Sequence, residues 1–203
     1  MRWYILESDD KRNARIRALQ ILVDALQEAL DKMECLMHEH HFFALVSRLK
    51  YIERWALMRS AKSENLAEHS LEVAMIAHGL CTIGNVRYDR NLNAERAALI
   101  GMYHDASEII TGDMPTPVKY FNAEIRAAYA EVESAAEQRL LATLPNDLLP
   151  VYESVFSHEE DDYLHRLVKA ADKISALIKC VDEAHAGNSE FITAARSTRE
   201  KLD

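Results

Sequence analysis

The chain has 203 residues, of which 49% are hydrophobic, and it contains only five Gly and four Pro. This length allows one substantial core with an appendage, and the scarcity of Gly and Pro favours a mostly helical protein. A formal charge of −9 argues against non-specific binding to polymeric nucleic acid, which depends on Lys and Arg neutralising phosphates.

The cysteines and the hydropathy pattern argue against secretion and membrane insertion. Cys35, Cys81 and Cys180 are an odd number, lie far apart and form no Cys-x-x-Cys pair. They therefore suggest neither a disulfide framework nor a thiolate zinc site. No apolar run approaches the ~20 residues of a membrane span, and the N-terminus lacks a signal-peptide core. We expect a cytoplasmic protein.

Residues 1–36 are predicted to form a helical extension ahead of a domain at 37–203. The extension has an apolar stripe at helical spacing, formed by Leu19, Leu22, Val23, Leu26, Leu30, Met33 and Met37. This stripe needs a partner surface, either on the following domain or on a second subunit. The neighbouring His38, His40 and His41 are interpreted as a solvated junction, because no carboxylate stands at ligand spacing.

A second amphipathic helix is predicted from Phe42 to Ile52, and it ends at Arg54 and Trp55. A guanidinium beside a flat ring suits a phosphate next to a sugar or base. The structural alternative is a buried Trp55 with Arg54 at the surface.

Asn65 and Glu68 match a capping box that opens a helix from Leu66 to Leu80. This helix is apolar on nearly every side, so we expect it to be central. His69 lies in its first turns, and its structural alternative is a core histidine bonded to a carbonyl or carboxylate.

A third helix is predicted from Asn93 to Ile110, with Asn93 as its cap and Thr111-Gly112 as a left-handed stop. It would place His104, Asp105 and Glu108 on one face. An isolated His-Asp pair is common by chance, so a polar pair at a helix end is the alternative.

Asp113 follows this helix on a loop that Pro115 and Pro117 stiffen, which would hold the carboxylate where a substrate can reach it. The alternative is an ordinary turn residue.

Another amphipathic helix is predicted from Ile125 to Leu144, and the charged run 158–162 is interpreted as a solvated helix start. Asp172 then lies within an apolar helical stretch from 164 to 181. A carboxylate there is costly unless it is paired or bound to metal. An ion pair with Lys169 is the structural alternative.

Taken together, the order His69, His104-Asp105, Asp172, with spacings of 35 residues (69 to 104) and 67 residues (105 to 172), resembles the HD-domain metal phosphohydrolases. The likeness is greatest to the bacterial 5′-deoxynucleotidases of the YfbR type. It extends from about Met37 to the C-terminus and rests on the motifs His-His-Phe-Phe-Ala at 40–44, Ser-Arg-Leu-Lys at 47–50, Arg54-Trp55, Glu-His-Ser at 68–70, Tyr-His-Asp-Ala-Ser-Glu at 103–108 and Thr-Gly-Asp-Met-Pro-Thr-Pro-Val-Lys-Tyr at 111–120.

The resemblance implies an all-α HD-domain helical bundle, often a homodimer, that removes phosphate from deoxyribonucleoside 5′-monophosphates with one divalent transition metal ion. The implied metal ligands are His69, His104, Asp105 and Asp172. The implied substrate contacts are Arg54, Trp55, Asp105, Asp113, Met114, Pro115, Thr116 and Asp172. Relative to this family, residues 1–36 are extra and the C-terminus is short, and the N-terminal helix is expected to cover the surface of the missing C-terminal segment.

Two imidazoles and two carboxylates suit Co, Mn, Zn or Fe better than Mg. A bound dication lowers the pKa of water from about 15.7 towards about 7 and so supplies hydroxide. Arg54 would neutralise the phosphoryl oxygens. Glu108 would orient or deprotonate the water, Asp113 would protonate the leaving 5′ oxygen, and these two roles are interchangeable. Trp55 would exclude a ribose 2′-hydroxyl.

Two other functions remain open from the sequence. An HD-type deoxynucleoside triphosphate triphosphohydrolase would keep the metal site but would need more Lys or Arg around the pocket than Arg54 and Lys119 provide. A degenerate HD module would bind a nucleotide without turnover, although every expected position is filled.

Overall fold

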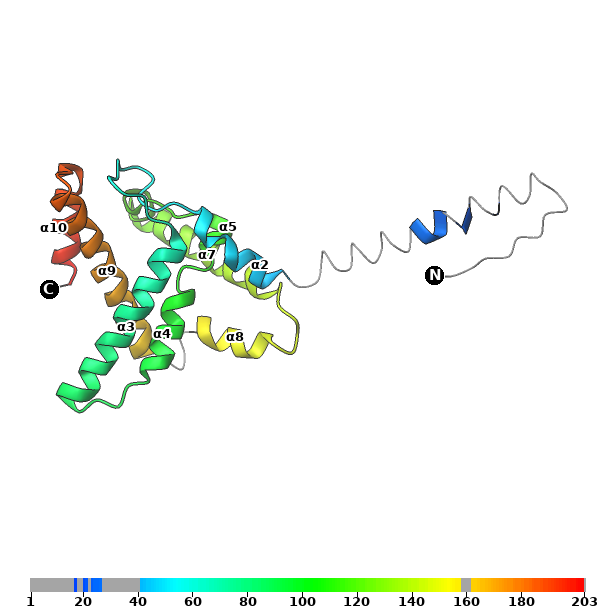
Figure 1. Cartoon of the computed structure of the whole chain (residues 1–203), viewed down its shortest axis with the longest axis horizontal. Helices are drawn as coiled ribbons and strands as arrows, with labels where there is room; N and C mark the ends of the chain where they lie inside the picture. Colours follow the sequence, from blue (N-terminus) through cyan, green and yellow to red (C-terminus); the bar gives the residue numbers. More distant parts are fainter. Residues whose placement is uncertain (1–16, 18–19, 22, 27–40, 158–161, 203) are drawn as a thin grey trace. The chain divides into compact units, whose positions relative to one another are not determined.

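The computed structural model describes residues 17, 20–21, 23–26, 41–157 and 162–202 (Figure 1). The chain divides into two compact units, residues 1–41 and 42–203. In the first unit the described residues between 17 and 26 are helical. Most of the apolar stripe, His38, His40 and the charged run at 158–161 lie outside the described residues, so the predicted boundary at 36/37 stays a prediction.

The second unit is helical, which confirms the predicted all-α class. Its elements are α2 (Phe42–Val46), the 3-10 helix η1 (Ser47–Tyr51), α3 (Leu66–Tyr88), α4 (Ala94–Tyr103), α5 (Glu108–Thr111), α6 (Thr116–Lys119), α7 (Ala123–Leu141), α8 (Leu149–Phe156), α9 (Asp162–His185), the 3-10 helix η2 (Ser189–Phe191) and α10 (Ile192–Glu200). Within the described ranges the only β-type pairing is an isolated bridge between Glu53 and Asn65.

The main core lies where α3, α4 and α9 pack side by side, with α8 against α4 (Figure 1). Side chains that are at least nine-tenths buried fill it: Val73, Ala77, Cys81, Ala94, Ala97, Ile100, Val155, Leu164, Val168 and Ala171. The predicted central position of the 66–80 helix is therefore confirmed. None of the helices in the described part of the chain is long and apolar enough to cross a membrane.

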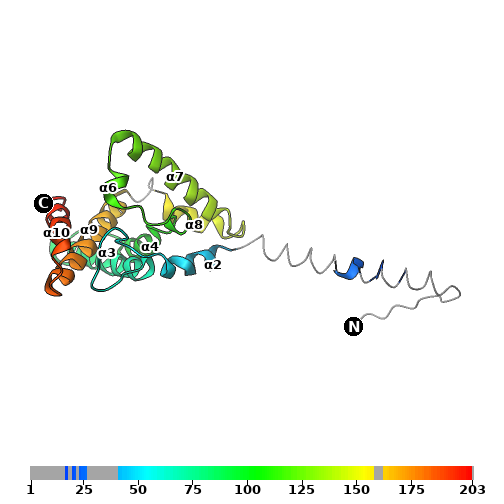
Figure 2. The same ribbon diagram turned by 90° about the horizontal axis from the view of Figure 1, so that it is seen from above.

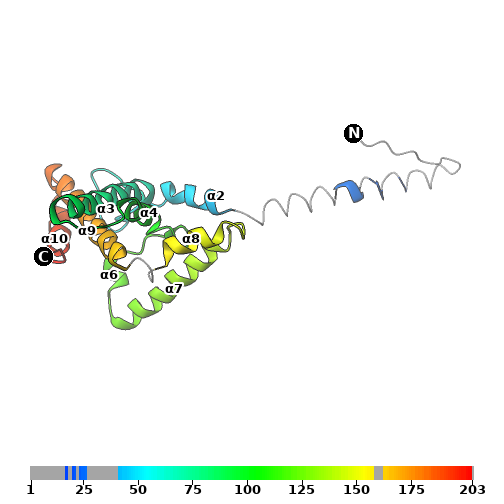
Figure 3. The same cartoon turned by 90° about the horizontal axis from the view of Figure 1, so that it is seen from below.

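A second buried cluster joins α2, α7 and α8 to the turn after α4. Its members are Phe42, Ala106, Leu140 and Leu144. Figures 2 and 3 show α7 next to α8 and set apart from α3, with α6 leading into it. This cluster holds the segment 104–112 against the rest of the domain.

Gly101 lets α3 and α4 approach closely. A Cβ atom at this position would lie 2.8 Å from the Ala74 Cα and 3.0 Å from the Ala74 nitrogen. Because both are backbone atoms, they cannot turn aside as a side chain would. The close approach fixes the end of α4 relative to the start of α3.

The predicted caps are present. The Asn65 side chain accepts hydrogen bonds from the N–H groups of Ala67 and Glu68, and Glu68 completes the capping box. Asn93 caps α4 through the Arg96 N–H. Gly112 ends α5 with a positive φ of 72°.

Four predicted helices differ from those observed. The helix predicted from Ile125 to Leu144 extends from Ala123 to Leu141. The Phe42–Ile52 helix becomes 3-10 after Val46 and ends at Tyr51. The helix that begins at Leu66 continues to Tyr88 and ends where Asp89 adopts a left-handed φ of 51°. The helix predicted for residues 93–110 was wrong in its second half, because α4 ends at Tyr103 and a turn separates it from α5.

Hydrogen bonds explain this interruption. The His104 Nδ1 atom makes a hydrogen bond to the Gly101 carbonyl oxygen at 2.8 Å. The N–H groups of Ala106 and Glu108 then bond only three residues back, to Tyr103 and Asp105. His104, Asp105 and Glu108 therefore lie on a tight turn and a new helix start, and not on one helix as predicted.

Candidate active site

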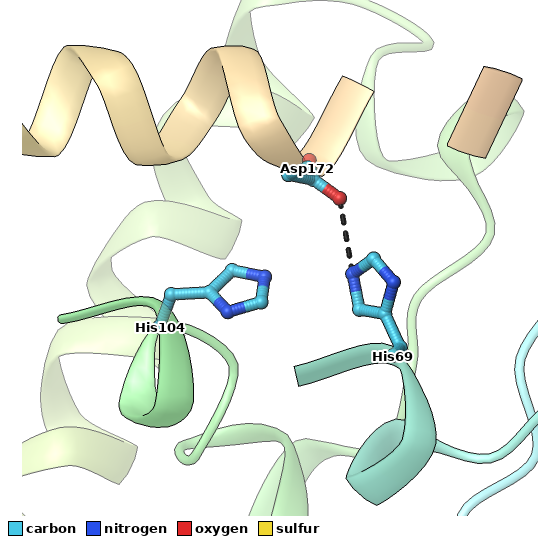
Figure 4. Close-up of side chains that lie close together, drawn as sticks. All are labelled: His69, His104 and Asp172. Atoms are coloured by element: carbon cyan, nitrogen blue, oxygen red, sulfur yellow. Dashed lines mark ion pairs between the residues drawn. The ribbon is translucent and has the colours of Figure 1, made fainter. Parts of the chain in front are cut away.

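Three helices supply the side chains of a compact His/Asp cluster. His69 comes from the first turn of α3, His104 follows α4, and Asp172 lies in the middle of α9 (Figure 4). One ligand atom from each lies within 4.8 Å of the others. The Asp105 Oδ2 is 3.0 Å from His104 Nε2 and 3.6 Å from His69 Nε2. All four residues proposed from the sequence as metal ligands therefore meet at one place.

The two imidazoles present the atoms that a metal would need. His104 Nδ1 donates to the Gly101 carbonyl, which leaves Nε2 with its lone pair in the neutral ring. The Nε2 atoms of His69 and His104 are buried and make no hydrogen bond within the described part of the chain. His69 Nε2 instead faces the Asp172 carboxylate at 3.1 Å. Two buried nitrogens beside two carboxylates fit a divalent transition metal.

The charges of the cluster are strongly coupled. Burial lowers the pKa of His104, but Asp105, Asp172 and the Gly101 carbonyl outweigh it and raise this pKa to about 8. Burial raises the pKa of Asp105, but His104, His69 and Arg54 hold it well below its usual range. The site thus keeps Asp105 as a carboxylate, which is the form that ligates a cation.

A buried hydrogen-bond chain lies behind His69. Its Nδ1 is 3.1 Å from Ser175 Oγ, and Ser175 donates to Glu72 Oε2 at 2.8 Å. Arg54 Nη1 approaches the same Nδ1 at 2.6 Å. A guanidinium can only donate, whereas a neutral His69 that ligates through Nε2 must carry its proton on Nδ1. Ligation therefore requires Arg54 to move away from this nitrogen, and Ser175 Oγ to accept a hydrogen bond from Nδ1–H.

Arg54 and Trp55 sit at the edge of this cluster. Arg54 is 13% exposed, and its Nη2 is 3.8 Å from Asp172 Oδ1. The surface alternative for Arg54 is therefore wrong. Trp55 is half-buried, with its ring 5.2 Å from that of Phe191. The Asp172 carboxylate faces His69 and Arg54, which explains a carboxylate in an apolar helix without Lys169.

Glu108 and Asp113 lie near Asp105. Glu108 is 8% exposed, and its Oε2 is buried without a hydrogen bond among the described residues. Burial, together with the charges of Asp105 and Asp113, raises the pKa of Glu108 to about 9. Burial also raises the pKa of Asp113, which accepts a hydrogen bond from the Trp55 backbone N–H.

The remaining loop residues line the approach to this carboxylate pair. Met114 and Pro115 are half-buried, while Thr116 is exposed as the first residue of α6. The 113–116 segment is thus placed next to Trp55 by the contact through Asp113.

Sequence reasoning missed three residues that contact the cluster: Glu64, Glu72 and Ser175. Glu72 stands three residues after His69, and Ser175 three residues after Asp172, so helical spacing was a signal that could have found both. Glu64 accepts hydrogen bonds from Arg54 and Trp55. Glu64 lies in a polar loop, ten residues after Arg54 in the sequence, and no local pattern indicates that the two side chains meet.

Comparison with known proteins agrees with this arrangement. The model of the YfbR-like 5′-deoxynucleotidases matches residues 41–203. The chain belongs to the YfbR-like 5′-deoxynucleotidase family. Over 168 residues it is 50% identical to the 5′-deoxynucleotidase YfbR of Shigella flexneri serotype 5b, an alignment that covers 82% of this chain and 84% of that protein. The resemblance proposed from the motifs is confirmed, as is the assignment to a family of phosphoric monoester hydrolases.

Solved structures show which fold this chain has. An HD-domain phosphohydrolase from Listeria innocua superposes with a TM-score of 0.70 at 25% identity, covering 78% of this chain and 76% of that chain. The cyanophage S-2L HD phosphohydrolase, solved with dA and one catalytic Zn²⁺, has a TM-score of 0.53 at 20% identity and covers 78% of this chain and 80% of its own. The HD-domain fold predicted from the sequence is confirmed.

Proposed function

We propose that this protein hydrolyses deoxyribonucleoside 5′-monophosphates to deoxyribonucleoside and phosphate, using one divalent transition metal ion. The observation that carries the proposal is the convergence of two buried imidazole Nε2 atoms and two carboxylates next to Arg54. The imidazoles and carboxylates suit a metal ion, and the adjacent guanidinium suits an anionic substrate.

His69, His104, Asp105 and Asp172 would hold the metal. When bound, the ion supplies a water of lowered pKa and neutralises charge on a phosphoryl oxygen. Arg54 adds a second positive charge to the same oxygens, because its guanidinium already lies 3.8 Å from Asp172. Co, Mn, Zn and Fe all suit this donor set.

Glu108 would orient and deprotonate the attacking water, and Asp113 would protonate the departing 5′ oxygen. Burial is the largest cause that raises the pKa of both carboxyl groups, to about 9 for Glu108, and it favours the protonated form of each. A cation bound beside Asp105 would favour the carboxylate form of Glu108, which is the form that a base requires. Asp113 is bonded to the Trp55 backbone and therefore lies on the substrate side of the site. This position favours the acid role for Asp113 and the base role for Glu108.

The substrate would lie over Trp55, with Asp113, Met114, Pro115 and Thr116 beside it and Asp105 and Asp172 below its phosphate. The Trp55 ring lies 5.2 Å from the Phe191 ring, and its indole nitrogen donates to Glu64 Oε2 at 2.9 Å, so these contacts make the ring a restrained wall. Such a wall can exclude a 2′-hydroxyl by steric overlap, which favours deoxyribose.

A triphosphate substrate fits less well. Lys119, the additional cation considered from the sequence, is paired with Glu133 at 2.6 Å. Arg54 is then the cation directly against the His/Asp cluster in the described residues. One guanidinium and one dication match a monophosphate better than the higher charge of a triphosphate.

We further infer a cytoplasmic homodimer, with residues 1–36 as a helical extension of the domain at 37–203. These inferences rest on the family and on the composition. Light scattering would measure the mass of the full chain and of a variant that lacks residues 1–36. If the deletion leaves solubility and thermal stability unchanged, the extension does not cover the domain as expected.

The experiment that tests the proposed function measures products from deoxyribo- and ribonucleoside 5′-monophosphates and from deoxynucleoside triphosphates. Each is incubated with Co²⁺, Mn²⁺, Zn²⁺ or Mg²⁺, beside a chelated control. We expect inorganic phosphate from the deoxy monophosphates only, and none after chelation. Release of triphosphate would favour the triphosphohydrolase, and turnover of no substrate would favour a nucleotide-binding module.

A further inference from the structure

The Glu64 carboxylate bridges the two residues proposed to contact substrate. Its Oε1 accepts a hydrogen bond from Arg54 Nη1 at 3.0 Å, and its Oε2 accepts one from the Trp55 indole nitrogen at 2.9 Å. The side chain is 12% exposed. One carboxyl group therefore fixes the distance between the guanidinium and the indole ring.

Trp55 needs such a restraint, because its backbone is strained. Its φ of 62° lies in the left-handed region, which large side chains rarely adopt. Backbone hydrogen bonds from the Arg54 N–H to the Glu64 carbonyl and from the Leu66 N–H to the Ile52 carbonyl hold the segment just before Trp55. The indole bond to Glu64 then fixes the ring itself.

Arg54 depends on Glu64 for a second reason. Its guanidinium now points at His69 Nδ1, but ligation through His69 Nε2 requires Arg54 to release that nitrogen. Glu64 Oε1, at 3.0 Å, is the acceptor that still holds the guanidinium beside Asp172 after this change. Among the described residues, Glu64 is the acceptor that the 52–65 loop offers to the Arg54 side chain.

We propose that Glu64 is a positioning residue that sets the preference for deoxyribose, by holding Trp55 and Arg54 in one fixed arrangement. This inference rests on the proposed function, because it assumes that Trp55 meets the sugar and Arg54 the phosphate. Glu64 acts through its two hydrogen-bonded neighbours, and its Oε1 also lies 3.5 Å from His69 Nδ1, on the side of the ring away from Nε2.

The test compares Glu64→Gln with Glu53→Gln as a matched control. Both substitutions remove one negative charge from the same loop, but Glu53 is exposed. We expect Glu64→Gln to lower kcat/KM for deoxyribonucleoside monophosphates about 10- to 100-fold, the usual effect of losing a hydrogen bond to a charged group. The deoxyribose-to-ribose ratio of kcat/KM should also fall about tenfold, whereas Glu53→Gln should change neither.

A second measurement reports on Trp55 without turnover. Trp3 and Trp55 are the two tryptophans of the chain, so a Trp3→Phe background isolates the emission of Trp55. We expect acrylamide to quench Trp55 about twice as efficiently when Glu64→Gln is added. Unchanged quenching, or an unchanged deoxyribose-to-ribose ratio, would overturn the proposal.

Thermal melting would show whether Glu64→Gln folds. If it does not, Trp55→Phe takes its place, because this change removes the indole donor and keeps a flat ring. A lower deoxyribose preference in Trp55→Phe is expected, and an unchanged one would refute the role of the Glu64 contact.

If the wild-type protein hydrolyses no monophosphate, the proposed function fails independently. The affinities for deoxyribo- and ribonucleotides, measured through the change in Trp55 fluorescence, then decide the role of Glu64. A deoxyribose preference in binding that Glu64→Gln removes supports it, and equal preferences in the two proteins contradict it.

Discussion

Replacing Gly101 with Ala tests whether the close approach of α3 and α4 holds the site together. The new Cβ would meet the Ala74 Cα at 2.8 Å and its nitrogen at 3.0 Å. Overpacking of this kind costs about 1–3 kcal/mol, and the better helix propensity of Ala returns about 0.5–1 kcal/mol. We expect a net loss of up to about 2.5 kcal/mol, which for a chain of this size lowers Tm by up to about 10 °C.

Gly79 provides a matched control, since it also lies within a helix but a Cβ there meets nothing within 4 Å. Gly79→Ala should therefore raise the stability by about 0.5–1 kcal/mol. Differential scanning calorimetry of the two variants beside the wild type gives the comparison. A Gly101→Ala protein at least as stable as the wild type would refute the reasoning about the α3–α4 contact.

Two further predictions concern residues behind the site. Ser175→Ala removes the hydroxyl at His69 Nδ1 and should weaken metal binding about 10- to 100-fold, measured by competition with a chelator; unchanged affinity would show that the hydroxyl does not orient the ring. Burial raises the pKa of Glu183, but Lys179 and the Ala61 N–H, among other donors, outweigh it and lower this pKa from 4.5 to about 2. A lowered carboxyl pKa stabilises the fold above pH 4.5, and this stabilisation is lost as the pH falls towards 2. The Tm difference between wild type and Glu183→Gln should thus be largest near pH 7 and shrink below pH 4.5, whereas a constant difference would contradict the assignment.

Glu183 also links the C-terminal region to the loop between Trp55 and Glu64. Its carboxylate accepts hydrogen bonds from the Ala61 and Lys62 N–H groups and from Asn188. The Asn188 side chain also donates to the Arg59 carbonyl. The loop between Trp55 and Glu64 is therefore anchored by the end of α9, far away in the sequence.

Local signals in the sequence predicted several helix starts and the set of proposed ligands that the fold brings together. The Asn65 capping box and the Asn93 cap gave two helix starts, and both are confirmed. His69, His104-Asp105 and Asp172 were found as a set because each is a polar residue in an apolar helical stretch. Their spacing resembles a family to which the chain belongs.

Other features depend on tertiary contacts that have no local pattern. The helix breaks after Tyr103 because the His104 ring, and not a backbone N–H group, is bonded to the Gly101 carbonyl. The periodicity of apolar residues does not reveal this competition between side chain and backbone. Glu64 gains its role only when the loop folds back, so that its carboxylate meets the Arg54 and Trp55 side chains. The left-handed backbone of Trp55 is equally invisible in the sequence, since a large aromatic residue gives no signal for a positive φ.

The central claim is that phosphate release depends on a metal held by the His/Asp cluster and on Glu108 beside it. The most direct measurement is inorganic phosphate release from a deoxyribonucleoside 5′-monophosphate by chelated protein, by the same protein reloaded with Co²⁺, and by reloaded Glu108→Ala. We predict no release from the first, full release from the second, and a rate at least about 100-fold lower from the third, although it binds Co²⁺ as the wild type does. Equal release by chelated and reloaded protein, or by Glu108→Ala and the wild type, would contradict the account.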